Sequence, residues 1–422
     1  MHLKKCTFVL LVITLVPYMV EAQNFYKEVS TDSTFLEKGK LVNGVREGQW
    51  TFERRKDGAV ITGFYTNGQP DSVWYKFYNY VAVEAILLKD AKKTGPYKTY
   101  DRYGKIVTSS NFENDVLNGT YFEYYDNGQV GLSGFYDQGK KDSTWTEYSA
   151  LGNKSFEQFY SNDLPVGTWK YYHPNGRVAR TESYKSGLLN GSVEEFHQNK
   201  NKTLSANYKN GLLNGKYNEY YKNGSLSVEG SYKNNLKTST WVSMSPDGVM
   251  FSIGEYLAGL KQGLWKYFYK SGAIQSEGKY KNDLKDSQWI DYYESGKLKS
   301  IGSYISDLRN GLWGHFYENE QLIQDENWKH GRLMDVSEYF SEQGEVLPKG
   351  SLVKGNGTRN IYFVNGELQI KETYQNGSPH GAWTTYHDNG NQASEEFYDN
   401  GEPAGRWKYY NRKGKLKRTR SF

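Results

Sequence analysis

The side chains that could do acid–base or metal chemistry are few, and their spacing follows a repeat. Six histidines come after residue 22: His173, His197, His315, His330, His380 and His387. Three of them, His173, His197 and His387, share one place in a 24-residue period where other periods have tyrosine. Equivalent positions two strands apart would be about 9.6 Å from each other, too far for two ligands with zinc–nitrogen bonds of about 2.1 Å. We expect these histidines to fill a tyrosine position, and no metal site is predicted.

Acidic and glycine-rich patterns point away from catalysis as well. Carboxylates such as Glu277, Asp283 and Asp286 fall in turns or on the polar side of strands. Paired acids for glycoside cleavage need one unique deep cleft, and no period differs from the others in a way that indicates one. None of the glycine-rich turns follows a strand and opens a helix, as a phosphate loop does. We predict no catalytic residue, no cofactor and no enzymatic activity.

The first 22 residues have the layout of a secretory signal peptide. Lys4 and Lys5 precede an apolar run from Cys6 to Val16, and Val20-Glu21-Ala22 fits a cleavage site before Gln23. The run is shorter than the roughly 20 residues that a membrane-spanning helix needs. An uncleaved anchor is the alternative. We expect an exported protein, periplasmic or at the cell surface or secreted, with no transmembrane segment and no cysteine after cleavage.

Composition indicates a folded chain that does not bind nucleic acid. The net charge of +5 is small for 422 residues, whereas nucleic-acid-binding domains are usually strongly basic. A mean hydropathy of −0.82 would suit a disordered chain. The chain nevertheless has 38 Tyr, 19 Phe and 11 Trp, and disordered chains are poor in aromatic residues. So many rings in a polar chain indicate many small cores, as in a repeat protein.

The elements that position these side chains recur every 24 residues. The period is marked by a small residue two before an aromatic one, at Gly48, Ser72, Gly95, Gly119, Ser143, Gly167, Gly191, Gly215, Ser239, Gly263, Ser287, Gly311, Asp335, Gly357, Gly381 and Gly405. Rings follow these anchors at two, five and seventeen residues, and a glycine follows at nine. The structural rings that we single out are Trp145, Tyr148, Trp169, Tyr172, Trp265, Phe268, Tyr280, Trp289, Tyr292, Trp383, Tyr386 and Trp407. The corresponding turn glycines are Gly128, Gly176, Gly224, Gly272, Gly296 and Gly390.

Each period predicts a β-hairpin. Two short ring-rich runs flank an Asn-Gly type pair, which favours a primed turn with positive φ at both central residues. A two-residue loop would place Trp265 opposite Gly278, so that a ring covers a strand glycine. Trp265 and Phe268 are three residues apart, so either both faces bury rings or a bulge rotates one of them. The prediction is an all-β fold, an elongated repeat array of about sixteen antiparallel hairpins in a single-layer twisted sheet.

The domain organisation follows from where the period holds. We expect a signal peptide at 1–22, an N-terminal cap segment at 23–46, and hairpin repeats over 47–422. Residues 341–357 contain Pro348 and a two-residue deletion in the period, which indicates a possible kink or joint.

The residues that recur at fixed positions of the 24-residue period resemble the MORN repeat, in the variant where an aromatic residue replaces the second glycine of Gly-x-Gly. The resemblance rests on Gly215-Lys216-Tyr217, the turn glycine Gly224 and Tyr232, and extends from about Gly44 to Phe422. It implies elongated antiparallel sheets of hairpins that act as scaffolds or binding surfaces. Some bacterial members are labelled antitoxins of toxin–antitoxin pairs, a role that the secretory signal argues against. The choline- or glucan-binding repeat is also similar, but its units are typically shorter.

The function predicted from these features is a non-catalytic exported scaffold that presents an extended β-surface to a protein partner in the cell envelope. The first alternative is a carbohydrate- or cell-wall-binding module, which requires one ring column to be exposed as a stacking stripe. The second is an antitoxin-like or immunity protein that binds a toxin. Cell-wall glycan is the alternative partner, and nucleic acid is not expected.

Overall fold

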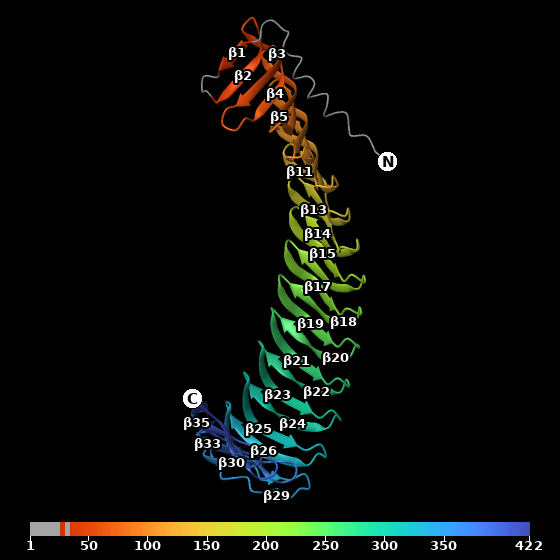
Figure 1. The fold of residues 1–422 in the computed structure, drawn as a ribbon. Coiled ribbons are helices and arrows are strands. Elements are labelled where there is room, and N and C mark those ends of the chain that lie inside the picture. Colours follow the sequence, from red (N-terminus) through yellow and green to blue (C-terminus); the bar gives the residue numbers. More distant parts are fainter. Residues whose placement is uncertain (1–25, 30–33) are drawn as a thin grey trace, which may run out of the picture. The chain divides into compact units, whose positions relative to one another are not determined.

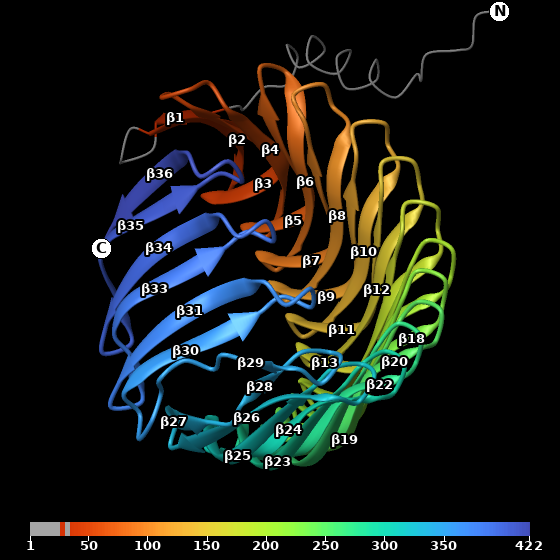
Figure 2. The same cartoon turned by 90° about the horizontal axis from the view of Figure 1, so that it is seen from below.

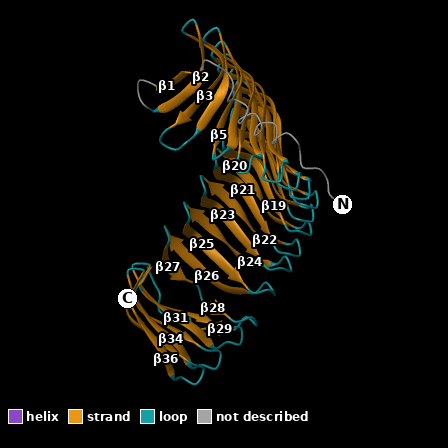
Figure 3. Cartoon of the chain, turned by 45° about the horizontal axis from the view of Figure 1, so that its top comes forward, coloured by secondary structure: helices purple, strands orange, loops and turns teal. Residues whose placement is uncertain are grey.

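The computed structural model describes residues 26–29 and 34–422 (Figure 1). Within these ranges the chain consists of strands and turns and contains no helix (Figure 3). The predicted all-β array of antiparallel hairpins with a 24-residue period is confirmed. The predicted signal peptide at 1–22 lies outside the described residues.

The chain divides into two compact units, at residues 1–200 and 201–422, and each is described by itself. In the described part of the N-terminal unit, each strand pairs antiparallel with the next. Its strands are β1 (Tyr26–Val29), β2 (Phe35–Val42), β3 (Val45–Arg54), β4 (Val60–Thr66), β5 (Gln69–Tyr78), β6 (Val81–Lys89), β7 (Lys92–Tyr100), β8 (Ile106–Glu113), β9 (Val116–Tyr124), β10 (Val130–Asp137), β11 (Lys140–Tyr148), β12 (Lys154–Ser161), β13 (Leu164–Tyr172), β14 (Val178–Lys185) and β15 (Leu188–Phe196).

The C-terminal unit contains two sheets of the same hairpins. The first consists of β16 (Lys202–Lys209), β17 (Leu212–Tyr220), β18 (Leu226–Lys233), β19 (Leu236–Met244), β20 (Met250–Leu257), β21 (Leu260–Phe268), β22 (Ile274–Lys281), β23 (Leu284–Tyr292), β24 (Leu298–Ile305), β25 (Leu308–Phe316), β26 (Leu322–Lys329) and β27 (Arg332–Val336). The second, seen as neighbouring strands in Figure 2, consists of β30 (Gly357–Tyr362), β31 (Leu368–Gln375), β32 (Ser378–Pro379), β33 (Gly381–Tyr386), β34 (Gln392–Asp399), β35 (Glu402–Tyr410) and β36 (Leu416–Ser421). Between them lies a short pair, β28 (Tyr339–Phe340) and β29 (Val346–Leu347).

The Asn-Gly turns differ from the predicted primed turns, so that part of the prediction was wrong. In the turn at Asn127-Gly128, only the glycine has positive φ, 82°. The Gly128 N–H donates to the carbonyl oxygen of Tyr125 (2.8 Å) and the Tyr125 N–H to that of Gln129 (2.9 Å). This is a type I turn followed by a left-handed glycine. The asparagine stabilises this turn through its side chain, because Asn127 Oδ1 accepts a hydrogen bond from the N–H of Gln129 (3.0 Å).

The extra turn residue is compensated by a bulge in the following strand. Phe268 pairs with Ile274 and Tyr267 with Ser276, so one residue of β22 is left over. Trp265 therefore still pairs with Gly278, as predicted.

The primed geometry occurs instead at the second turn of each repeat. Asn210 and Gly211 have φ of 50° and 81°, and Asn282 and Asp283 have 52° and 69°. The loop at Asn282-Asp283 has two residues, because Lys281 pairs with Leu284. Both turns of the repeat thus depend on residues that tolerate the left-handed region.

The small anchor residue adopts a left-handed backbone conformation and lies in a β-bulge. Gly263 has φ of 68°, and serine anchors such as Ser287 adopt a φ of 60°. Between β20 and β21, Ile253 pairs with Lys266 and Glu255 with Gln262, so three residues face Gly254 alone. The anchor is small because this conformation is costly for large or β-branched side chains. The distortion swings the indole two residues later onto the preceding strand.

Seven of these indoles cover a glycine, but of the preceding strand rather than of the one predicted. A Cβ built on Gly254 would lie 2.1 Å from Trp265 Cδ2, and one on Gly278 would lie 2.2 Å from Trp289 Cδ2. The same contact joins Gly39 to Trp50, Gly63 to Trp74, Gly134 to Trp145, Gly230 to Trp241 and Gly302 to Trp313. The expectation that Trp265 covers Gly278 was therefore wrong, although the two residues pair.

Glycine at the covered position sets the angle of the indole to the neighbouring tyrosine ring. Over glycines the two rings are nearly perpendicular, as in Tyr256–Trp265 (89°) and Tyr280–Trp289 (86°). Where Gln158 holds the covered position, Tyr160 and Trp169 meet at 49° instead. A side chain at this position prevents the indole from lying flat on the strand.

The ends of the predicted repeat region have their own features. Gly39 lies under Trp50, so the pattern of a covered glycine reaches into the segment 23–46. Residues 341–357 hold no full-length hairpin, and the two sheets of the C-terminal unit meet there around a small core of Leu333, Val336, Leu352 and Tyr374.

Candidate binding surface

One face of each sheet, the tryptophan face, carries the indole rings, and the chain's own cations lie over several of them. Trp265 is 4% exposed and packs against Tyr280 and Tyr267. Lys261 Nζ lies 4.4 Å from the centre of the Trp265 ring, and Lys285 Nζ lies 4.1 Å from that of Trp289. The Trp265 indole also donates its N–H to a backbone carbonyl, that of Glu255 (3.2 Å), whereas the equivalent N–H groups of Trp74 and Trp145 are buried without a partner. Such rings are closed to a stacking ligand.

The rings five residues past the anchors lie on the opposite face. Trp265 and Tyr267 share a face, so Lys266 and Phe268 point to the other one. The rotation considered for Trp265 and Phe268 is thus resolved in favour of rings on both faces. In the described part of either unit, most contacts between elements join strands that are neighbours in one sheet.

The rings five residues past the anchors and the apolar residues that follow the first turn are half-buried, and we call them together the open-face stripe. Most of these rings pair with the aliphatic residue that follows the turn, as Tyr292 does with Leu298, whereas Tyr148 pairs with Lys154. The stripe comprises Tyr124, Val130, Tyr148, Tyr172 and Val178 in the N-terminal unit, and Tyr220, Leu226, Phe268, Ile274, Tyr292, Leu298, Phe316 and Leu322 in the C-terminal unit. It repeats once every two strands, about 9.6 Å.

Charged side chains beside the stripe form ion pairs with each other. Lys266 Nζ lies 2.8 Å from Glu277 Oε2, and the Tyr292 hydroxyl donates to Glu277 Oε1 (2.9 Å). The hydrogen bond from Lys266 holds the pKa of Glu277 below its usual value, although burial opposes this. Burial raises the pKa of Tyr292, and the bond to Glu277 adds to the shift. Neither group is set up to exchange a proton with a ligand near pH 7.

The histidines of the shared column take the place of tyrosines in a structural hydrogen bond. Tyr269 and Tyr293 donate their hydroxyls to the carbonyl oxygens of Tyr292 and Phe316, both at 2.8 Å. His173 Nε2 makes the same bond to Phe196 O (2.8 Å), and His387 Nε2 to Tyr410 O (3.2 Å). Each links one turn to the next repeat, which explains why the column takes either residue.

A buried ionic cluster joins the two sheets of the C-terminal unit, and sequence reasoning missed it. Arg359 on β30 donates to Gln324 (3.0 Å) and Glu326 (2.5 Å), both on β26. It also lies 3.7 Å from Glu372 on β31. In the repeat, Glu326 and Glu372 stand at the position of the covered glycine, but Glu182 and Glu396 do so too, so this departure alone does not identify the cluster in the sequence.

The pKa values of the two carboxylates of this cluster are shifted in opposite directions. Burial alone raises the pKa of Glu326, but His315, 3.1 Å away, and Arg359 outweigh it and hold the pKa well below the usual value. Burial raises the pKa of Glu372, which Arg359 only partly offsets. The cluster is enclosed, so it serves the joint between the sheets rather than a reaction with a substrate.

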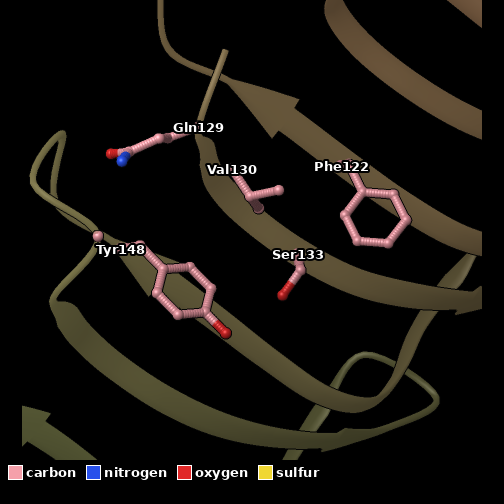
Figure 4. A pocket seen from close by; sticks show the side chains of 6 residues that line it. Phe122, Gln129, Val130, Ser133 and Tyr148 are labelled. Atoms are coloured by element: carbon pink, nitrogen blue, oxygen red, sulfur yellow. The ribbon is translucent and has the colours of Figure 1, made fainter. Parts of the chain in front are cut away.

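A shallow hollow of about 400 Å³ interrupts the open-face stripe in the N-terminal unit. It is lined by Phe122, Gln129, Val130, Ser133, Tyr148 and Gly152. Figure 4 shows the rings of Phe122 and Tyr148 on either side of Val130 and Ser133.

The structural residues singled out from the sequence divide between the two faces. Trp145, Trp169, Trp265 and Trp289 are buried on the tryptophan face, and Trp383 and Trp407 are half-buried. Tyr148, Tyr172, Phe268, Tyr292 and Tyr386 are half-buried rings of the column five past the anchor, and Tyr280 packs between Trp265 and Trp289. The turn glycines Gly128, Gly176, Gly224, Gly272, Gly296 and Gly390 all have positive φ.

Comparison with known proteins identifies the repeat. Six segments match the MORN repeat variant, at residues 117–140, 165–186, 213–234, 261–282, 285–306 and 379–400. No curated protein matches the chain. The described residues contain no group of three or more histidine, cysteine or acidic side chains arranged to hold a metal ion, and no helix that could cross a membrane.

Solved structures resemble the chain only remotely. A crystal structure of S. aureus TarM in complex with fondaparinux, alpha-GlcNAc-glycerol and UDP aligns at 11% identity over 33% of this chain and 24% of that one, with a TM-score of 0.15. The Photorhabdus luminescens Tc holotoxin pore aligns at 10% identity over 90% of this chain and 23% of that one, also at 0.15. This chain thus spans about a quarter of the length of these structures, and similarities this low support no conclusion about it.

Proposed function

Because the chain belongs to the MORN repeat variant family, we propose that it is a non-catalytic scaffold that binds a protein partner along its open face. The observation that carries the proposal is the open-face stripe. Soluble proteins rarely expose long contiguous apolar patches, and those that do usually use them for interactions. On the tryptophan face, Lys261, Lys285 and their equivalents lie over several of the rings, whereas no such cation lies over Phe268 or Tyr292 of the open-face stripe among the described residues.

We further propose that binding takes place in the cell envelope. Support comes from the leader-like sequence of residues 1–22, with Lys4 and Lys5 before the apolar run. An extended sheet surface that repeats about every 9.6 Å suits an elongated partner, which would contact several repeats at once.

In-cell photocrosslinking tests the face that the partner uses. A photoreactive phenylalanine analogue at Tyr292 or Tyr172, both on the open face, is expected to capture a protein from the envelope fraction. The matched control places the same group at Tyr280, which points to the tryptophan face. Equal capture from both faces, or capture from Tyr280 alone, would refute the proposed surface. Any hydrolytic or transfer activity lost with one point mutation of the pure chain would refute the non-catalytic role.

A further inference from the structure

The hollow beside Ser133 lies where small side chains occupy positions that carry larger side chains in several other repeats. Ser133 pairs with Phe122 on one side and with Thr146 on the other. At two equivalent places of the C-terminal unit, the pairs are Val242–Ile253 and Ile290–Ile301, whose branched side chains fill the surface. At other equivalent places the pair is charged or small, as in Lys266–Glu277 and Gly314–Asp325. Two small hydroxyl side chains next to Phe122 therefore leave about 400 Å³ open.

The lining of the hollow has a definite chemical character. Two aromatic rings, Phe122 and Tyr148, form its sides, and Val130 lies between them (Figure 4). The polar groups are the Ser133 hydroxyl, the Gln129 amide and the Tyr148 hydroxyl, and no lining residue carries a charge. Ser133 Oγ makes only a long contact with the carbonyl oxygen of Thr146 (3.5 Å), which leaves the hydroxyl able to bond to a ligand.

We propose that this hollow binds one neutral pyranose ring of an oligosaccharide. A pyranose presents a face of C–H groups that can lie against an aromatic ring, and hydroxyls at its edge that can bond to Ser133 and Gln129. An apolar side chain of a protein would leave these polar groups without partners, which costs free energy. An anionic ligand would find no cation among the lining residues. The volume is near the lower end of the roughly 300–1,000 Å³ typical of small-molecule sites, which fits one ring.

This inference is independent of the protein-partner proposal. It concerns a single place in the N-terminal unit, whereas the partner is proposed to use the whole stripe. A chain that binds sugar here can still lack a protein partner, and the reverse also holds.

The test compares two isoleucine substitutions in the same column. Ser133→Ile fills the hollow with the residue that Ile253 and Ile301 provide elsewhere, so the fold is expected to accept it. Thr181→Ile makes the same change two repeats along and serves as the control. Saturation-transfer NMR and calorimetry would follow trisaccharides of glucose, galactose and N-acetylglucosamine binding to the mature chain.

We expect at least one of these sugars to bind with a Kd of about 1 mM or tighter. Ser133→Ile and Phe122→Ala should each weaken binding by about tenfold or more, and Thr181→Ile should leave it unchanged. Thermal unfolding of each variant separates loss of binding from loss of fold. No binding of any of the three sugars, equal binding by Ser133→Ile, or displacement of the sugar only by changes on the tryptophan face would overturn the proposal.

Discussion

The covered glycines show how a single missing Cβ organises this fold. Gly278 has Trp289 Cδ2 only 2.2 Å from where its Cβ would be, and the Trp289 ring meets Tyr280 at 86°. The indole N–H donates to the carbonyl oxygen of Lys279 (3.0 Å), one residue past that glycine. The tilted ring of Trp169 over Gln158 keeps the equivalent bond, to Phe159 (2.9 Å), so the fold tolerates both arrangements.

Replacement of Gly278 by alanine should destabilise the chain. The new methyl group overlaps Trp289 and forces the indole to tilt, and overpacking of this kind costs about 1–3 kcal/mol. Chemical denaturation followed by tryptophan fluorescence would measure the loss. Gln158→Ala is the control, because Trp169 is already tilted, and it should change the stability by much less. A Gly278→Ala chain as stable as the parent would show that the close contact is unimportant.

Among the elements, the cluster of Glu326, Arg359 and Glu372 joins the two sheets of the C-terminal unit, which no regular repeat does. The covered-glycine position holds Glu326 and Glu372 here, and both face Arg359. Because Arg359 is on β30 and Glu326 on β26, their ion pair ties one sheet to the other across the irregular segment. The small core around Leu333 and Leu352 excludes water from it.

Removal of Arg359 should loosen the joint. Arg359→Met leaves Glu326 and Glu372 buried without their shared cation, and breaking a buried pair from one side costs about 3–5 kcal/mol. Hydrogen exchange should show the loss concentrated at β26, β30 and β31. Lys408→Met, which breaks the exposed pair with Glu395, is the matched control and should cost little. Uniform loss of protection along the C-terminal unit would contradict a local joint.

Glu372 should make the stability of the joint depend on pH. Its pKa is raised by burial, so the folded chain binds this proton more tightly than the unfolded chain does. The resulting stabilisation is complete below the unfolded pKa of about 4.5 and is lost as the pH rises through the folded pKa. Glu372→Gln should therefore remove a decline of stability above about pH 4.5, measured by denaturation across pH. A variant with the same pH profile as the parent would show that Glu372 does not titrate in this way.

At the scale of the whole molecule, stability is local. Most element contacts join strands adjacent in the sheet, so each hairpin is sheltered by its neighbours and not by a central core. A destabilised hairpin should therefore affect nearby repeats more than distant ones. In the Gly278→Ala chain, hydrogen exchange should accelerate in β21–β24 and remain unchanged in β9–β12. Equal acceleration in both regions would indicate one cooperative core.

Export is expected to remove the first 22 residues. Mass spectrometry of the chain from a fractionated host cell should find Gln23 as the first residue, in the fraction outside the cytoplasm. Changing Lys4 and Lys5 to glutamate should retain the uncleaved chain inside, because the positive end of the leader is lost. A chain that begins with Met1 in the cytoplasm would remove the basis for an envelope partner.

The sequence alone predicted the period, the hairpins and the pairing of Trp265 with Gly278, because these follow from the local spacing of rings and turn residues and from the alternation of side chains. It assigned the primed turns to the wrong pairs, since Asn-Gly and Asn-Asp both tolerate positive φ and only the strands on either side select the turn type. Which strand an indole covers depends on the bulge at the anchor, and which face stays open depends on where Lys261 and Lys285 extend. The joint at Arg359 and the hollow at Ser133 bring together residues from different strands. The sequence could not predict these two features, because they arise from contacts between strands that no single repeat encodes.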